Sequence, residues 1–209
     1  MTMDQRALII FTKLPRAGEV KTRLGRAVGM DRAADIYREL AEHAFGIADE
    51  LASGGTKVYL FYDPIATGQD IRSWIKRRFS YVPQQGRSLG DRMQHAFAVA
   101  VGDGAQQTVI IGTDVPELQA SMVNNAFNRL ANHDIVIGPS FDGGYFLVGM
   151  TAPVKDVFSG VEWSTGQVFD GSMAKIRQLD LSCSVLPALA DIDTEQDLRE
   201  YETRIRLKK

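Results

Sequence analysis

The chain contains two short apolar runs, Thr108-Val-Ile-Ile-Gly-Thr-Asp114 and Asp134-Ile-Val-Ile-Gly138, and a third run, Tyr145-Phe-Leu-Val-Gly149, follows closely. Each run is rich in β-branched or aromatic residues and has glycine or a turn residue at its end, which is typical of a buried strand. Asp114 and Asp142 stand where the chain leaves the first two runs. In an open α/β sheet, ligands bind in the crevice outside the carboxyl ends of the strands. The two carboxylates therefore predict a binding site at that edge.

Outward from these runs, short apolar segments alternate with segments of helical periodicity. We expect strands at residues 7–13, 57–62, 81–84, 108–114, 134–138, 145–150 and 184–186, and helices at residues 31–52, 69–79, 89–101, 119–132, 165–179 and 194–205. This order predicts an α/β fold with three layers, α/β/α, around a mixed, mainly parallel sheet. The short turn at residues 141–145 makes its two strands antiparallel. No linker or repeat interrupts the pattern, so we expect one domain over residues 1–209.

The composition excludes several classes of protein. A net charge of −2 argues against a broad basic face for duplex nucleic acid. The single cysteine, Cys183, cannot form an internal disulfide, and no apolar run reaches the roughly 18–20 residues of a membrane span. The opening residues do not have the pattern of a signal peptide. We therefore expect a cytoplasmic protein without nucleic-acid or membrane partners, and the sequence leaves its oligomeric state open.

The segment between the first strand and the first helix, residues 13–23, is called the first loop below. It carries Lys13, Arg16, Lys21 and Arg23, and it has Gly18 to let the backbone approach a ligand. Phosphate groups bind to fixed N–H donors and to nearby cations, so the loop predicts a phosphate site. It lacks the P-loop and dinucleotide-binding patterns, and a solvated basic loop is the alternative interpretation.

Carboxylates at the sheet edge also predict a metal site. Asp114 and a second acid would suit a hard divalent cation, and Mg²⁺ or Mn²⁺ is the expected cofactor. Both strand-end acids have structural alternatives: Asp114 could cap the helix near residue 119, and Asp142 precedes Gly143 and Gly144 in a tight-turn pattern. The two glycines suit either a turn or the close approach of a ligand.

Two further segments resemble helix starts. Ser164 or Thr165 could be the N-cap of the helix at residues 165–179. Thr194 and Asp197 resemble a capping box in which aspartate replaces glutamate. That pairing explains both residues structurally, and it leaves Asp193 available as a further acid.

Six motifs occur in order: Thr12-Lys13-x-Pro15-x-x-Gly18-x-Val20-Lys21-Thr22-Arg23-Leu24, Gln85-Gly86-x-x-Leu89-Gly90-x-Arg92-Met93, Ile111-Gly112-x-Asp114-x-Pro116-x-Leu118, Gly138-Pro139-x-x-Asp142-Gly143-Gly144-Tyr145, Trp163-Ser164-Thr165, and Asp191-Ile192-Asp193-Thr194-x-x-Asp197-Leu198. Together they resemble the DUF2064 family of bacterial proteins, also called radical-SAM/selenodomain-associated transferases, which has a GT-A-like (nucleotide-diphospho-sugar transferase) fold. The family is similar to the phospholactate and molybdopterin guanylyltransferases.

The resemblance implies a phosphate-gripping first loop and a metal-holding Asp114. It also implies that the segment with Gln85, Gly86 and Leu89 lies by the nucleotide base, and that the loop from Asp142 to Tyr145 faces the acceptor. The chain departs from the family pattern at Gly166-Gln167, and again at Thr113 and Val115 beside Asp114.

We therefore expect a metal-dependent enzyme that uses a nucleotide-activated donor, and specifically a glycosyltransferase that acts from a nucleotide sugar on a small acceptor. The alternatives are a nucleotidyltransferase that releases pyrophosphate from an NTP and a non-catalytic nucleotide sensor or partner-binding subunit. The expected catalytic residues are Lys21, Asp114 and Asp142, and the expected metal ligands are Asp114 and Asp193. The expected substrate contacts are Lys13, Gly18, Lys21, Arg23, Gln85, Gly86, Leu89, Gly143, Gly144 and Tyr145.

Overall fold

The computed structural model describes residues 6–163 and 165–207, which form one mixed sheet and its covering helices. The strands of this part of the chain are β1 (Arg6–Thr12), β2 (Lys57–Tyr62), β3 (Ser80–Pro83), β4 (Gln107–Ile111), β5 (Ile135–Pro139), β6 (Tyr145–Met150) and β7 (Cys183–Val185). Its helices are α1 (Thr22–Val28), α2 (Met30–Ser53), α3 (Gly68–Ile75), α4 (Leu89–Gly102), α5 (Ala120–Arg129), the 3₁₀-helix η1 (Lys155–Phe158), α6 (Val168–Gln178) and α7 (Glu195–Leu207).

The sheet has the strand order β3-β2-β1-β4-β6-β5-β7. All neighbouring pairs are parallel except those of β6, which runs antiparallel to both β4 and β5. Every other strand therefore ends at the edge where β6 begins. The expected mixed, mainly parallel sheet is confirmed, and so is the antiparallel pair joined by the turn at residues 141–145.

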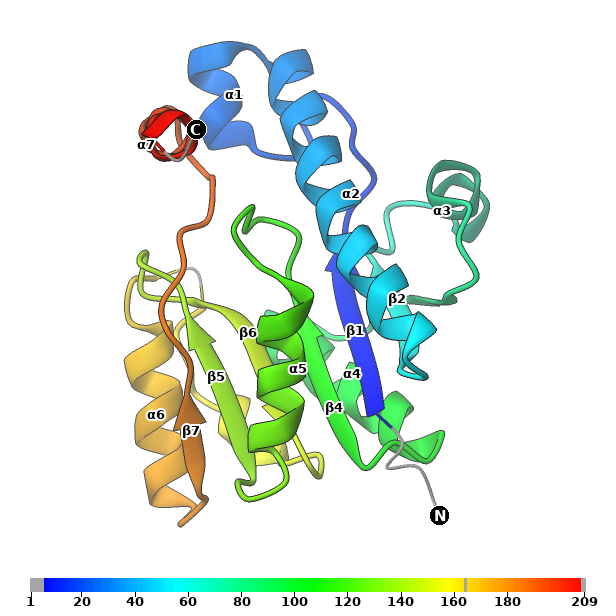
Figure 1. Ribbon diagram of the computed structural model, residues 1–209, viewed down its shortest axis with the longest axis vertical. Helices are drawn as coiled ribbons and strands as arrows, with labels where there is room; N and C mark the ends of the chain where they lie inside the picture. The colour runs from blue at the N-terminus through cyan, green and yellow to red at the C-terminus, as the bar shows by residue number, and fades with distance from the viewer. Residues whose placement is uncertain (1–5, 164, 208–209) are drawn as a thin grey trace.

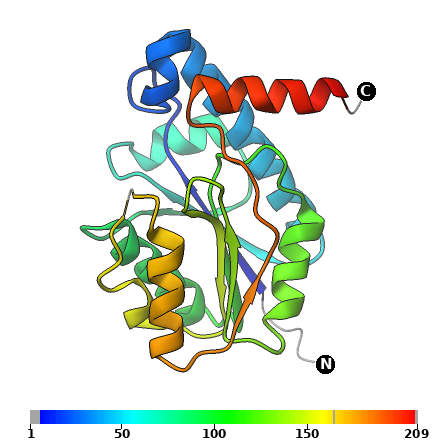
Figure 2. The ribbon, with the colours of Figure 1, turned by 90° about the vertical axis from the view of Figure 1, so that its left-hand side faces the viewer.

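Helices cover both faces of the sheet, as the two ribbon views show (Figures 1 and 2). Side chains alternate along β1, so that Leu8 and Ile10 pack beneath α2 and α5 while Ala7 and Ile9 pack beneath α4. The first face also carries α3, and the second carries η1 and α6. This arrangement confirms the three-layer α/β/α fold.

The helices α1 and α7 lie together beyond the carboxyl edge of the sheet (Figure 1). Leu24 of α1 and Ile36 of α2 form a small core with Ile192, and Tyr201 of α7 packs against it. This core attaches the end of the chain to its beginning. No helix among the described residues is long and apolar enough to cross a membrane.

One helix was missed in the sequence, and the expected start of another is wrong. The sequence pattern did not indicate α1, a short helix that begins at Thr22, contains Gly25 and has Gly29 as its C-cap. The helix expected from residue 165 begins at Val168, because the Thr165 hydroxyl donates to the Glu162 carbonyl oxygen at 2.7 Å and the N-cap is Gln167. Ser164, the other N-cap candidate, lies outside the described residues.

Candidate functional site

A cleft of about 660 Å³ opens at the edge of the sheet where the parallel strands end. Its walls come from the end of β1, the end of β4 with residues 112–114, and the first half of β6. Part of the first loop, residues 19–23, closes one side, and the N-terminal part of α4 closes another. The cleft therefore lies at the position that the strand-end carboxylates predict.

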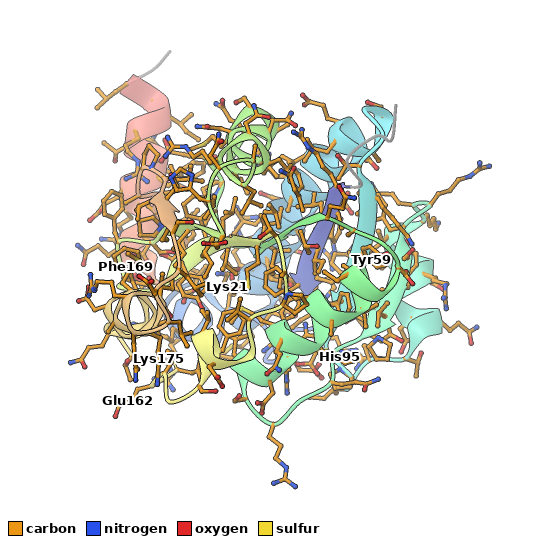
Figure 3. The ribbon with its side chains drawn as sticks, turned by 90° about the horizontal axis from the view of Figure 1, so that it is seen from below. Lys21, Tyr59, His95, Glu162, Phe169 and Lys175 are labelled. Carbon is orange, nitrogen blue, oxygen red and sulfur yellow. The ribbon has the colours of Figure 1, made fainter. Side chains whose placement is uncertain are left out.

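The Lys21 side chain lies between two carboxylates at the wall of this cleft. Its Nζ is 2.6 Å from Asp114 Oδ1 and 2.6 Å from Asp193 Oδ1. The lysine side chain is only 3% exposed, whereas the two aspartates are 43% and 39% exposed. Figure 3 labels Lys21 near the centre of the outline in a view from below. The structure thus brings together three residues that are far apart in the sequence.

The charge of Lys21 depends on these two partners. Burial alone lowers the pKa of a lysine, but the negative charges of Asp114 and Asp193 outweigh that effect and raise the pKa of Lys21 above its usual value. The Lys21 ammonium donates a hydrogen bond to Asp193. Asp114 Oδ1 is buried and accepts no well-directed hydrogen bond, although the ammonium is at ion-pair distance. Lys21 is therefore a buried cation with two partly exposed anions.

Backbone contacts hold the two aspartates next to each other. The segment after β7 runs back along the end of β5. There the Leu189 N–H donates a hydrogen bond to the Pro139 carbonyl oxygen, and the Leu189 carbonyl oxygen accepts one from the Phe141 N–H. Beyond it, the Ile192 N–H donates to the Asp114 carbonyl oxygen at 3.1 Å, which places Asp193 beside Asp114. The alternative in which Asp114 caps this helix is wrong, because the N-cap of α5 is Gln119 and no side chain caps it.

The capping box before α7 is confirmed. Asp197 Oδ2 accepts the Thr194 N–H at 2.7 Å, and the Thr194 hydroxyl accepts the Asp197 N–H at 3.3 Å. Asp197 also accepts the Asp193 N–H at 3.0 Å. The box therefore fixes the backbone of Asp193 and leaves its carboxylate to face Lys21.

Tyr37 of α2 connects the end of β1 to the segment that follows β4. The sequence did not indicate this role, because Tyr37 lies among apolar helix residues. Its hydroxyl oxygen accepts the Lys13 N–H at 2.8 Å and lies 3.1 Å from the Thr12 hydroxyl. The Thr113 hydroxyl donates to the same oxygen at 3.3 Å. Burial, followed by the charge of Asp114, raises the pKa of Tyr37. The tyrosine thus stays neutral and links the end of β1 to the segment that follows β4.

The remaining cations of the first loop have separate positions. Lys13, whose side chain is exposed, and Arg23 both line the cleft. Arg16 instead lies 3.5 Å from Asp70 and 3.9 Å from Glu19, and it is not part of the cleft wall. Gly18 has a φ of +80° with open space around its Cα, which suits a glycine in a turn.

On the α4 side, the structure places Gln84 rather than Gln85 at the cleft. Gln84 is buried, its amide donates to the Phe61 carbonyl oxygen, and its own side-chain oxygen accepts from Arg92 at 3.2 Å. Gln85 is exposed and does not line the cleft, whereas Leu89 does. Sequence reasoning missed Gln84 and Arg92 as wall residues, although Arg92 belongs to a motif quoted above.

Gly86 has a structural explanation. Its φ is +138°, and an added Cβ would lie 2.6 Å from the Cβ of Asp91. Asp91 forms the capping box of α4 with Ser88. The glycine therefore allows the chain to pass close to the start of α4.

The turn between β5 and β6 carries Asp142 away from the cleft wall. Asp142 is exposed, and its Oδ1 accepts the Gly144 N–H at 2.9 Å, which is a turn interaction. Gly143 has a φ of +88°, and an added Cβ would meet the Gly166 backbone oxygen at 2.1 Å. The close neighbour of Gly143 is thus another part of the chain. Tyr145, at the start of β6, does line the cleft.

Asp191 adds a further acid near this turn. Burial, together with the charges of Asp142 and Asp193, raises the pKa of Asp191 to about 6. Asp191 therefore lies close enough to Asp142 and Asp193 to be affected by their charges, although of these three acids only Asp193 lines the cleft. Carboxylate oxygens in this arrangement can accept hydrogen bonds from hydroxyl groups.

The carboxylate pair, Asp114 and Asp193, fits a divalent cation. Each carboxylate is partly exposed, and each has one oxygen 2.6 Å from the Lys21 ammonium, so the pair already holds one cationic group. The described residues contain no group of three histidine, cysteine or acidic side chains placed to hold a metal. Because Mg²⁺ is commonly held by one or two carboxylates plus water and substrate phosphates, two aspartates are sufficient.

Comparison with solved structures identifies the type of fold. A crystal structure from Desulfovibrio desulfuricans G20, provisionally named a nucleotide-diphospho-sugar transferase, has a TM-score of 0.88 and 35% identity, covering 94% of this chain and 85% of that one. A CMP:2-keto-3-deoxy-manno-octonic acid synthetase complexed with CTP has a TM-score of 0.60 at 11% identity over 98% of this chain and 100% of that one. The fold is therefore that of the nucleotide-diphospho-sugar transferases.

The family follows from the sequence. The model of an uncharacterized protein family conserved in bacteria (DUF2064) matches residues 47–165, and the chain belongs to this family, which confirms the resemblance. A protein from Mycobacterium tuberculosis H37Rv, Rv0371c in complex with manganese, shares the fold with a TM-score of 0.56 at 14% identity, over 94% of this chain and 97% of that one. Comparison with curated proteins gave no match.

Proposed function

We propose that this protein is a metal-dependent transferase that binds a nucleotide-activated donor in the cleft at the carboxyl edge of the sheet. The observation that carries the proposal is the buried Lys21 between Asp114 and Asp193, at the wall of a cleft that also exposes Lys13 and Arg23. In a metal–phosphate complex, the carboxylate pair would bind the metal and the neighbouring cationic side chains would bind the phosphates. In the same proposal, residues 1–209 form one domain and act in the cytoplasm.

The residues of the chain have distinct roles in this proposal. Asp114 and Asp193 would hold Mg²⁺ or Mn²⁺, which offsets negative charge on the leaving phosphate when it is bound. Lys21, Lys13 and Arg23 would bind the phosphates and favour the charge that develops as the bond to the leaving group breaks. Tyr37 would keep the two strand ends in register, so that these groups meet the phosphates at fixed positions.

Glycosyl transfer from a nucleotide sugar is the reaction we favour. The relative at 35% identity is provisionally named a nucleotide-diphospho-sugar transferase. Asp193 lines the cleft, and Asp142 and Asp191 lie near enough to it to share its electrostatic surroundings, so the oxygens of these acids could accept hydrogen bonds from sugar or acceptor hydroxyls. The transferred group would therefore lie towards β5 and the base towards Gln84 and Arg92.

Nucleotidyl transfer is the second candidate, and a separate observation favours it. Four cationic side chains, Lys13, Lys21, Arg23 and Arg92, line the cleft. A triphosphate carries more charge than the diphosphate of a nucleotide sugar, so it would use more of these cations. In this reaction an acceptor attacks the α-phosphate of an NTP, and pyrophosphate is released.

A thermal-shift screen of the four NTPs and the common nucleotide sugars, with and without Mn²⁺ or Mg²⁺, tests the proposal. A ligand at about 100 times its Kd adds roughly 2.7 kcal/mol of stability, which is about 5–11 °C for a chain of this size. Product analysis then separates the candidates, because glycosyl transfer releases a nucleotide and nucleotidyl transfer releases pyrophosphate. A shift without turnover would favour a nucleotide sensor.

The variant Asp114→Asn tests the metal assignment. We expect it to lose the metal-dependent part of the thermal shift and metal-dependent turnover, because the amide cannot replace the charge of the carboxylate. Asp35→Asn is the matched control, since Asp35 is exposed on α2 and, among the residues that the structure describes, forms an ion pair with Arg38 alone, at 2.6 Å. Equal metal dependence in both variants would exclude Asp114 as a ligand.

A further inference from the structure

Lys21 occupies the position that a cation needs on the carboxylate pair. Its Nζ is 2.6 Å from one oxygen of each aspartate, and carboxylate oxygens bind Mg²⁺ at about 2.0–2.1 Å. An ammonium group and a divalent cation that both bridge Asp114 and Asp193 would overlap. We propose that Lys21 and the divalent cation exclude each other from this pair, and that the phosphates of the substrate allow the cation to enter by giving Lys21 another anion to bind.

The surroundings of Lys21 explain why it needs another anion. The side chain is 3% exposed, so water cannot replace the aspartates around the ammonium while it stays in place. Removing one partner from a buried ion pair leaves a charge without compensation, which is strongly unfavourable. A cation that arrives alone must therefore compete with Lys21, whereas a cation that arrives with a phosphate does not.

The backbone at Lys21 is consistent with a residue that serves the site. Lys21 has φ 47° and ψ 42°, the left-handed conformation, at the N-cap of α1. For a residue with a Cβ this conformation is costly and is concentrated at functional sites. It directs the lysine towards the acids, while its neighbours Thr22 and Arg23 line the cleft. The phosphates of a substrate would therefore bind within reach of Lys21.

Lys21 differs from Lys13 in that it has acidic partners at ion-pair distance. Lys13 has an exposed side chain, and no ion pair joins it to an acid among the described residues. Its removal changes the local charge by the same amount but frees no carboxylate. Lys13→Met is therefore the matched control for Lys21→Met, because both variants keep an unbranched apolar side chain and lose one positive charge.

The inference rests on the proposed function, and it predicts positive coupling between the cation and phosphate. We expect inorganic pyrophosphate to tighten Mn²⁺ binding to the wild-type protein on the order of tenfold, a typical size for coupled sites. By reciprocity, Mn²⁺ tightens pyrophosphate binding by the same factor. In Lys21→Met, Mn²⁺ alone should bind on the order of tenfold more tightly than in the wild type, and the coupling should be largely lost.

Electron paramagnetic resonance of free Mn²⁺ measures these affinities without any turnover, after correction for the Mn²⁺–pyrophosphate complex in the buffer. Lys13→Met should change the affinity for Mn²⁺ alone by less than about threefold, since screened charges interact weakly. The exclusion would be overturned if the wild type and Lys21→Met bound Mn²⁺ alone with equal affinity. It would also be overturned if Lys13→Met and Lys21→Met gained equally in affinity for Mn²⁺ alone.

Failure of the proposed function has a different signature. If wild-type protein with pyrophosphate binds no Mn²⁺, or if Asp114→Asn binds it equally well, the metal site itself is wrong. Should Lys21→Met not fold, as far-UV circular dichroism would show, Lys21→Gln replaces it with a neutral polar side chain. The wild-type measurement is also a test by itself. If pyrophosphate does not raise the affinity of the wild-type protein for Mn²⁺, the exclusion is overturned.

Discussion

Gly143 allows a sharp test of the turn between β5 and β6. The Gly143→Ala variant places a Cβ 2.1 Å from the Gly166 backbone oxygen, a distance that no real Cβ contact tolerates. The neighbouring atoms are backbone, so no side-chain rotation relieves the clash. The Gly143 carbonyl oxygen also accepts the Phe169 N–H at 2.9 Å, and the movement that relieves the clash strains this hydrogen bond.

The magnitude follows from three contributions. A φ of +88° costs a residue with a Cβ about 1–2 kcal/mol. The lower conformational entropy of the unfolded alanine variant offsets about 0.4–1 kcal/mol of this cost. A weakened hydrogen bond costs about 1 kcal/mol, and strain of the overpacked type costs about 1–3 kcal/mol. We expect the free energy of unfolding to fall by about 3 kcal/mol, which lowers the Tm by about 6–12 °C.

Differential scanning calorimetry of the ligand-free protein measures this change, and Gly18→Ala is the matched control. Gly18 has a similar φ of +80° but no heavy atom within 4 Å of the added Cβ. It should therefore show the conformational cost alone, about 1 kcal/mol or 2–4 °C. If Gly143→Ala loses no more stability than Gly18→Ala, the contact with Gly166 does not determine the role of the glycine.

Two further predictions concern the groups around Lys21. Tyr37→Phe removes the acceptor of the Lys13 N–H and should lower the free energy of unfolding by about 2 kcal/mol; urea denaturation that finds no loss would contradict the connecting role of Tyr37. Asp191→Asn tests a pH dependence whose sign follows from the pKa of about 6, against a usual 3.8. Between these values the folded state binds more protons, so stability falls as the pH rises. With EDTA present, the variant should be more stable than the wild type by roughly 1 kcal/mol at pH 7, after a discount for solvent screening, and equally stable near pH 4. A gain of the same size at both pH values would show that ionisation of Asp191 is not its cause.

The sequence was sufficient for the layers and for most elements of the fold. The strands at residues 57–62 and 145–150 match β2 and β6 at both ends, because turn residues bound each apolar run. The helix α1 could not be predicted in this way. It is only seven residues long, with just Leu24 and Gly25 buried, so its periodic signal is too short to register.

The candidate site was only partly accessible from the sequence. The positions of Asp114 and Lys13 follow from the rule that strand ends carry the ligand site. The choice between Gln84 and Gln85 depends on strand register, and a shift of one residue reverses the face of every side chain. Tyr37 occupies an apolar helix face, where a buried aromatic residue is expected for packing alone, and only the coordinates show the contacts of its hydroxyl group.

The separation of the site residues along the chain also affects how the protein folds. Lys21 and Asp193 are 172 positions apart, so their ion pair forms only after the segment that follows β7 has docked beside β4. Long-range contacts of this kind form slowly, because the entropy of closing a long loop must be overcome first. During synthesis, Lys21 therefore remains without one of its two partners until the segment that carries Asp193 has been made. Binding at the carboxylate pair would thus report that this segment has docked, and a chain shortened before Asp193 would lose one of the two carboxylates even if the rest of the sheet formed.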